Sequence, residues 1–213
     1  MPLVFAWLLA CDFGFTLPSS DPAPEGPAKP GMTLPIRFRR NILPGAVSGP
    51  PPPDAGIRAD QCEDMQDGGP LADGECLTAQ IHCGETVIGH TRGGVKRYNT
   101  RFYEANFCTP GTTQHDGGDE RVYLLELPEP QTRAIVYLDT PCGNLDLAAL
   151  KLTNDSCPSE GHILPQCEMN IKPGSQREKV DLWNNAPTQW WLVVEGQGNE
   201  EGAFALTVQC EAW

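Results

Sequence analysis

Short runs in which apolar and polar residues alternate occur along the chain from about residue 83 onward. In segment 121–127, Val122 and Leu124 face one way, while Tyr123 and Leu125 face the other. A period of two predicts β-strands that bury one face. We expect strands at residues 85–91, 94–99, 121–127, 132–139, 145–152, 177–183, 189–195 and 203–210.

Turn residues separate these runs, and no stretch of helical length has an apolar period of 3.6 residues. The turns are marked by glycine and proline, at 93–94, 117–118, 128–130, 173–174 and 196–202. Short strands at such regular spacing predict an all-β fold, an antiparallel jelly-roll-like β-sandwich of about eight strands.

Four strand segments also resemble, in order and spacing, the bacterial pre-peptidase C-terminal domain family. Residues 83–91 (CGETVIGHT) are similar to the family's opening G-x-T-V-x-G strand, and 122–128 (VYLLELP) to its V-Y-x-F-x-L-P strand. Residues 145–147 (LDL) resemble part of its D-L-D-L strand. The closest likeness is 190–196 (WWLVVEG) with 202–208 (GAFALTV), which resembles Y-Y-L-V-V-D-G followed by G-x-F-x-L-x-V.

This resemblance, which covers about residues 83–211, implies a non-catalytic jelly-roll sandwich from an exported protein. Some members of the family bind calcium, and some bind polymers such as collagen or polysaccharide. We therefore expect residues 83–213 to form the sandwich, preceded by a cysteine-containing lead-in segment at 60–82.

The N-terminal residues predict export and a lipid anchor. Residues 1–11 resemble the end of a bacterial lipoprotein signal, in which an apolar core closes on Leu8-Leu9-Ala10-Cys11. Acylation of Cys11 would attach the chain to a bacterial membrane; the alternative is an ordinary thiol. Residues 12–59 are rich in proline and poor in apolar residues, so we expect a disordered, proline-rich tether. The predicted location is the cell envelope, or outside the cell if Cys11 is not acylated.

The net charge differs between the N-terminal part of the chain and the rest. Residues 1–59 are almost neutral, whereas residues 60–213 carry twenty-four Asp and Glu against ten Lys and Arg. An acidic folded region repels nucleic acid, which we therefore do not expect as a partner.

The cysteine count supports disulfides in an exported domain. Without Cys11, eight cysteines remain, an even number. From the expected loops we predict the pairs Cys62–Cys76, Cys83–Cys210, Cys108–Cys142 and Cys157–Cys167. A zinc site is the alternative, but no two cysteines have the C-x₂-C spacing.

Calcium is the one cofactor that the residues indicate. Asp116, Asp119 and Glu120 lie on a glycine-rich loop, and carboxylate oxygens on flexible loops are typical Ca²⁺ ligands. The family's strand pairing would bring Asp146 to the same loop. An acidic turn without a metal is the alternative.

Trp190 and Trp191 are the candidate ligand-binding residues. As neighbours on a strand they face opposite sides, so one of them points away from the core. Exposed, it would be an aromatic anchor for a ligand. The alternative is that Trp191 packs under residues 181–187, beside Trp183.

These observations favour a non-catalytic module over an enzyme. The sequence contains neither a G-x-S-x-G nor an H-E-x-x-H motif, and we expect no enzymatic activity. The predicted function is that of a binding or accessory module for an extracellular polymer (glycan or protein) or for Ca²⁺. The alternative is an accessory subunit or regulator of a separately encoded secreted peptidase or other hydrolase.

Overall fold

The structure is a computed structural model that describes residues 75–106, 114–151 and 164–213, together with Ile57, Asp60, Cys62, Leu71, Cys108, Cys157 and Pro158. The predicted signal and lipid anchor at 1–11, with Cys11, lie outside the described residues. So does the predicted tether at 12–59, apart from Ile57. Within the described ranges, no helix has the length and apolar character needed to cross a membrane.

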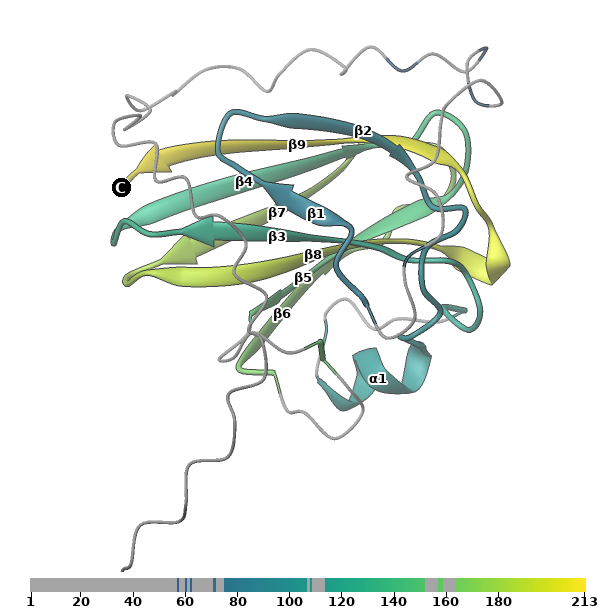
Figure 1. The fold of residues 1–213 in the computed structure, drawn as a ribbon, viewed down its shortest axis with the longest axis horizontal. Coiled ribbons are helices and arrows are strands. Elements are labelled where there is room, and N and C mark those ends of the chain that lie inside the picture. Colours follow the sequence, from purple (N-terminus) through teal and green to yellow (C-terminus); the bar gives the residue numbers. More distant parts are fainter. Residues whose placement is uncertain are drawn as a thin grey trace, which may run out of the picture. The chain divides into compact units, whose positions relative to one another are not determined.

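Two sheets account for most of the described chain (Figure 1). The five-stranded sheet has the order β1-β3-β8-β5-β6, and the four-stranded sheet has the order β2-β9-β4-β7. The strands are β1 (Ala79–Ile81), β2 (Thr86–His90), β3 (Arg121–Leu127), β4 (Thr132–Asp139), β5 (Leu145–Lys151), β6 (Gln166–Asn170), β7 (Glu178–Asn184), β8 (Thr188–Gly196) and β9 (Ala203–Ala212). This is the predicted all-β sandwich. One neighbouring pair, β1 and β3, is parallel, whereas the prediction was wholly antiparallel.

Seven of the eight predicted strands are confirmed as β2, β3, β4, β5, β7, β8 and β9, with ends that differ by at most two residues. The prediction of a strand at 94–99 was wrong: of these residues only Val95 makes an isolated bridge, to Glu120. The main-chain N–H groups of Arg97 and Tyr98 donate to the Glu120 carboxylate and not to a neighbouring strand. The Glu120 side chain thus takes the place of the backbone acceptors that a neighbouring strand would supply.

Four of the described elements, each of six residues or fewer, were missed, and one of them is the 3₁₀ helix η2 (Gln197–Asn199). Helix α1 (Thr100–Ala105) has only six residues, too few to show a helical period. It begins at Asn99, whose side-chain oxygen accepts a hydrogen bond from Phe102 N at 2.8 Å and so caps the first turn. Strands β1 and β6 have three and five residues.

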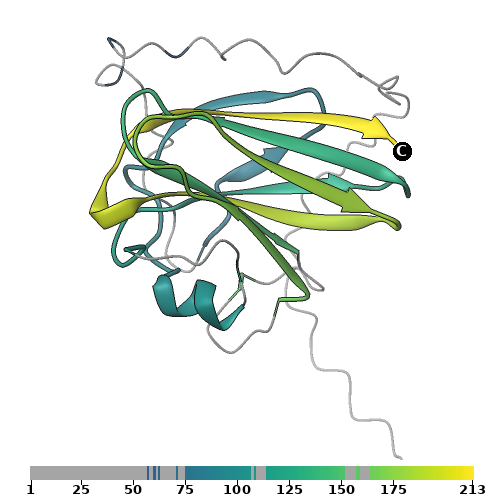
Figure 2. The same ribbon diagram turned by 180° about the vertical axis from the view of Figure 1, so that it is seen from behind.

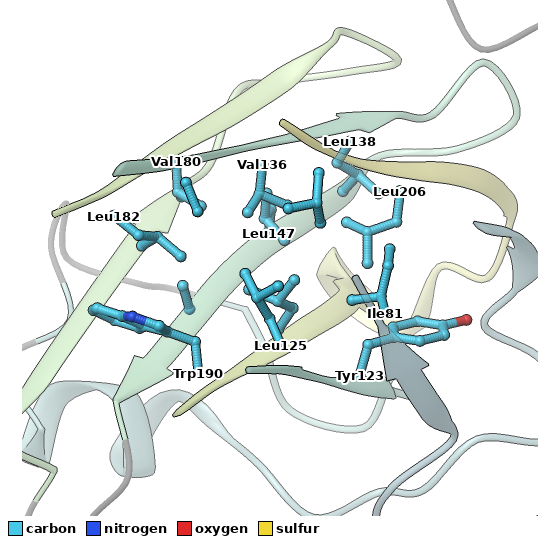
Figure 3. Packing of buried hydrophobic residues seen from close by; sticks show 14 of the residues in the cluster. Ile81, Tyr123, Leu125, Val136, Leu138, Leu147, Val180, Leu182, Trp190 and Leu206 are labelled. Carbon is cyan, nitrogen blue, oxygen red and sulfur yellow. The ribbon is translucent and has the colours of Figure 1, made fainter. Parts of the chain in front are cut away.

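The core lies between the two sheets and is drawn in Figure 3. Leu125 and Trp190 from the five-stranded sheet meet Leu182, Val136 and Leu206 from the four-stranded sheet. The Trp190 ring is fully buried, and its Nε1–H donates to Asn184 Oδ1 at 2.9 Å, which satisfies its one polar atom.

All eight candidate cysteines form disulfides, but only one pair was predicted correctly. Cys83 and Cys210 are bonded because β2 and β9 pair antiparallel near these residues. The predicted pairs Cys62–Cys76, Cys108–Cys142 and Cys157–Cys167 were wrong. The observed bonds are Cys62–Cys142, Cys76–Cys157 and Cys108–Cys167. Two of the wrong pairs joined cysteines close in sequence, whereas the observed bonds span 59 to 127 residues and join segments that only the packing brings together.

Candidate functional site

The two sheets differ in what lies on their outer faces. On the five-stranded sheet, helix α1 lies on the side away from the four-stranded sheet, as Figure 2 shows from behind. We call this outer face the covered face; its apolar strand residues include Val122, Ala148, Leu150, Trp191 and Val193. The outer face of the four-stranded sheet is called the open face; it carries Ile88, Arg133, Asp181, Trp183 and Glu211.

The cover consists of residues 98–106 and 114–119, which we call the covering layer. Tyr98, Phe102 and Tyr103 pack in one apolar cluster with Trp191 and Val193. The aromatic rings of Phe102 and Tyr103 meet edge to face, with centroids 5.4 Å apart. The disulfides Cys76–Cys157 and Cys108–Cys167 belong to the same cluster, and the second joins the residue that closely follows α1 to β6.

At one end of the covered face the apolar cluster gives way to buried acidic groups. Asp146 and Glu195 are cross-strand partners on β5 and β8. From the covering layer, the Tyr103 hydroxyl donates to the Glu195 carboxylate. His115 Nε2 lies 2.8 Å from Asp146 Oδ2, within hydrogen-bond distance, and the His115 and Tyr103 rings meet edge to face. Glu120, as described above, accepts from two main-chain N–H groups.

Burial keeps these carboxyl groups protonated to an unusually high pH. It raises the pKa of Glu195 to about 9, and the neighbouring carboxyl groups of Glu120 and Asp146 add to the rise. Burial also raises the pKa of Glu120 to about 7, against the effect of its main-chain hydrogen bonds. The pKa of Asp146 is raised by the same cause, although the hydrogen bond with His115 opposes it.

Carboxyl groups with raised pKa values beside a histidine are common in active sites, where they act as general acids or bases. In this structure, however, Glu120, Asp146, Glu195 and His115 are each at most 2% exposed and are thus shielded from solvent. Their hydrogen bonds run between the sheet and the covering layer. The arrangement therefore fastens the covering layer to the sheet.

The open face presents a row of side chains to solvent. Trp183, Arg133 and Glu211 are cross-strand neighbours on β7, β4 and β9. The Arg133 guanidinium stacks on the Trp183 ring, with Cζ 4.7 Å from its centroid. The Trp213 ring meets Trp183 edge to face at 5.4 Å, and Trp213 N donates to Gln131 O at 3.0 Å, which fixes the backbone there.

The charged groups around Trp183 are paired with one another. Arg133 binds Asp181 at 2.7 Å and Glu211 at 2.5 Å, and Lys179 Nζ lies 2.8 Å from Asp181 Oδ2. The hydrogen bond to Glu211 is the main cause that raises the pKa of Arg133. Burial acts to raise the pKa of Asp181, but hydrogen bonds from Lys179 and Arg133 outweigh it and hold the pKa below its ordinary value.

The two tryptophans predicted as ligand anchors face opposite sides of β8, as expected, but both are buried. Trp190 lies in the core, and Trp191 lies beneath the covering layer and not beneath residues 181–187. The exposed tryptophans are Trp183 and Trp213, at 49% and 50%. The alternation of Val180 and Leu182 with Trp183 already indicated that Trp183 faces away from the core.

The carboxylates predicted as calcium ligands have separate partners. Asp116 accepts from Thr100 N at 3.1 Å, and Asp119 accepts from Gly93 N at 2.9 Å and pairs with Lys96. As the family resemblance implied, Asp146 lies beside this loop, where it contacts His115. Among the described residues, no group of three or more His, Cys, Asp or Glu side chains is placed to hold a metal ion. Calcium binding stays a prediction from the sequence.

No protein-family model and no curated protein matches the sequence. Among solved structures, the pre-peptidase C-terminal domain of a collagenase from Bacillus anthracis is similar, with 14% identity and a TM-score of 0.38; the match covers 63% of this chain and 98% of that one. A periplasmic inhibitor of g-type lysozyme from Aeromonas hydrophila is similar with 10% identity and a TM-score of 0.33, over 60% of this chain and 85% of that one. The first of these structures represents the family that the strand motifs resemble.

Proposed function

We propose that this chain is an exported, non-catalytic binding module that recognises its ligand through the open face. The observation that carries the proposal is the exposed, fixed pair Trp183 and Trp213. Large aromatic side chains are costly to leave in water and are the commonest anchors of binding sites. Of the large hydrophobic side chains in the described part of the chain, only Ile88 is as exposed.

Export is supported by the four disulfides, because such bonds persist in oxidising compartments outside the cytoplasm. The proposal includes the lipid anchor at Cys11 and the tether at 12–59, which would hold the module away from a bacterial membrane. The mass of the intact protein extracted from membranes tests the anchor. Acyl chains on Cys11 support it, and a free thiol there overturns it.

The binding role is tested with the full, disulfide-intact chain and a panel of extracellular polymers: soluble polysaccharides, gelatin and cell-wall fractions. The variant Trp183→Ala/Trp213→Ala removes the exposed rings, and Ile88→Ala is the matched control. Ile88 lies on the same face but on β2, at the opposite edge of the sheet from β7. We expect binding to at least one polymer, weakened at least about tenfold in the double variant and unchanged in Ile88→Ala.

Two results would contradict the proposal. One is a panel in which no polymer binds, which includes the case where the chain acts only on a hydrolase. The other is polymer binding that persists undiminished in Trp183→Ala/Trp213→Ala.

A further inference from the structure

We propose that the ligand of the open face is an uncharged carbohydrate chain, with sugar rings against Trp183 and Trp213 and sugar hydroxyls on the charged side chains around them. This inference rests on the proposed function and names the class of its ligand. It depends on the charge balance, the fixed geometry and the small apolar area of this face.

Local charge balance favours an uncharged ligand over a strongly ionic one. Arg133 and Lys179 are matched by Asp181 and Glu211, and every one of the four takes part in a contact of 2.8 Å or less within the group. The whole chain, by contrast, has a net charge of −13. A polyanion is repelled by this surplus. A polycation would have to displace Arg133 and Lys179 from the two carboxylates beside Trp183, whereas a neutral hydroxyl can donate to their remaining lone pairs without breaking an ion pair. An uncharged ligand meets neither obstacle.

The fixed geometry favours a ligand with a flat apolar side. Arg133 on the ring of Trp183 and Trp213 against it hold the indole in one orientation, yet about half of the Trp183 surface remains accessible. A ring that is already oriented loses little conformational entropy on binding. Sugar rings present a face of C–H groups to such a surface, because the hydroxyls lie around their rim.

Hydrogen-bonding groups surround the rings, where a sugar's hydroxyls would lie. The side chains of Asp181 and Glu211 are 29% and 20% exposed, and that of Lys179 is 43% exposed. Carboxylate oxygens accept from hydroxyls, and the ammonium group donates to them. Existing ion pairs hold these groups in place, so a ligand adds hydrogen bonds without the need to order the side chains first.

The apolar area is too small for a folded protein partner. Stable protein interfaces bury about 1,200–2,000 Å² in total around a continuous apolar core. On the open face, the exposed tryptophan pair is separated from Ile88 by β4 and β9, whose outward side chains include Thr207 and Gln209 as well as Ile135 and Tyr137; neither of the latter two is among the exposed large hydrophobic side chains. A narrow aromatic strip with polar edges matches a single polymer chain.

Affinity electrophoresis or titration calorimetry tests the ligand class with the full chain. The probes are neutral soluble glucans and xyloglucan, a polyanionic pectin, a polycationic chitosan, and gelatin. We expect binding to at least one neutral polysaccharide, with a dissociation constant that changes less than about twofold between 0.05 and 0.5 M salt. Trp183→Ala should weaken it at least about tenfold, Trp183→Phe should restore part of it, and Ile88→Ala should leave it unchanged.

The outcomes separate the two proposals. Binding of gelatin or of a charged polymer that depends on Trp183, without binding of a neutral polysaccharide, overturns the carbohydrate inference and leaves the proposed function standing. Absence of any binding that depends on Trp183 or Trp213 overturns both. Circular dichroism and thermal unfolding of each variant verify that a loss of binding is not a loss of fold.

Discussion

Trp191 and Trp183 both point outward from a sheet of the same sandwich, and their surroundings are opposite. Trp191, on the covered face, is 4% exposed, whereas Trp183, on the open face, is 49% exposed. The alternation along each strand determines which face a side chain takes. Whether that face meets solvent depends on a separate segment, here the covering layer, which the Cys108–Cys167 disulfide ties to β6 just after α1.

Charged groups show the same contrast. Glu195 on the covered face is removed from water, and its pKa rises to about 9. Asp181 on the open face is partly solvated and paired with cations, and its pKa falls. A buried carboxyl group with no cation beside it, such as Glu195, stays protonated and serves only the fold. A partly exposed carboxylate that is paired with cations, such as Asp181, stays charged and is accessible to a ligand.

The largest expected effect distinguishes the two tryptophans by stability. Trp191→Ala leaves a cavity between β8 and the covering layer and should lower the free energy of unfolding by about 3–5 kcal/mol. Trp183→Ala removes an exposed ring and its contacts with Arg133 and Trp213, and should cost about 1 kcal/mol or less. Denaturant unfolding of the disulfide-intact proteins measures both. Equal losses in the free energy of unfolding would show that Trp191 is not packed more tightly than Trp183, and so that the covering layer does not shield its face.

The contrast between these faces marks the limit of what the sequence predicted. Seven strands followed from alternation and turn residues, because both signals are local. Alternation shows that Trp183 and Trp191 point outward, but it does not show which of them is covered. The cover over Trp191 comes from α1, which is too short to show a helical period in the sequence. The disulfide Cys108–Cys167 joins this cover to β6, and its pairing depends on the same packing. Asp146 was placed beside the 115–120 loop only through the family's strand pairing.

A smaller effect should follow from release of the covering layer. Cys108→Ala/Cys167→Ala removes the bond between the residue that follows α1 and β6, and should cost about 2–4 kcal/mol. Because this bond lies on the covered face, amide hydrogen exchange should accelerate in α1 while β7 keeps its protection. Polymer binding through Trp183 should persist.

The matched control is Cys83→Ala/Cys210→Ala, which frees the ends of β2 and β9 and leaves the covering layer bonded. Here α1 should keep its slow exchange. If α1 exchanges equally fast in both double variants, then the covering layer is not fastened independently of the rest of the sandwich.

The smallest expected loss on substitution concerns the acidic end of the covered face. Glu195 faces Tyr103 in α1, Asp146 on the next strand, and Glu120. The folded chain holds a proton on Glu195 up to about pH 9, whereas the unfolded chain releases it near the ordinary pKa of 4.5. Stability should therefore be highest at acidic pH and should fall as the pH rises from about 5 to about 9. Glu195→Gln has no such proton to retain, so its stability should fall less steeply, with a loss of about 1 kcal/mol at pH 5.

Asp181→Asn on the open face tests whether this pH dependence belongs to the covered face. The pKa of Asp181 is lowered in the folded state, so its contribution is present above the ordinary pKa and is lost only on acidification. The slope between pH 5 and pH 9 should thus be unchanged in Asp181→Asn and reduced in Glu195→Gln, as measured by denaturant unfolding at each pH. A slope that is unchanged in Glu195→Gln would mean that Glu195 does not retain its proton in the folded chain. A slope that is reduced in Asp181→Asn would mean that the pH dependence between pH 5 and pH 9 does not belong to the covered face alone.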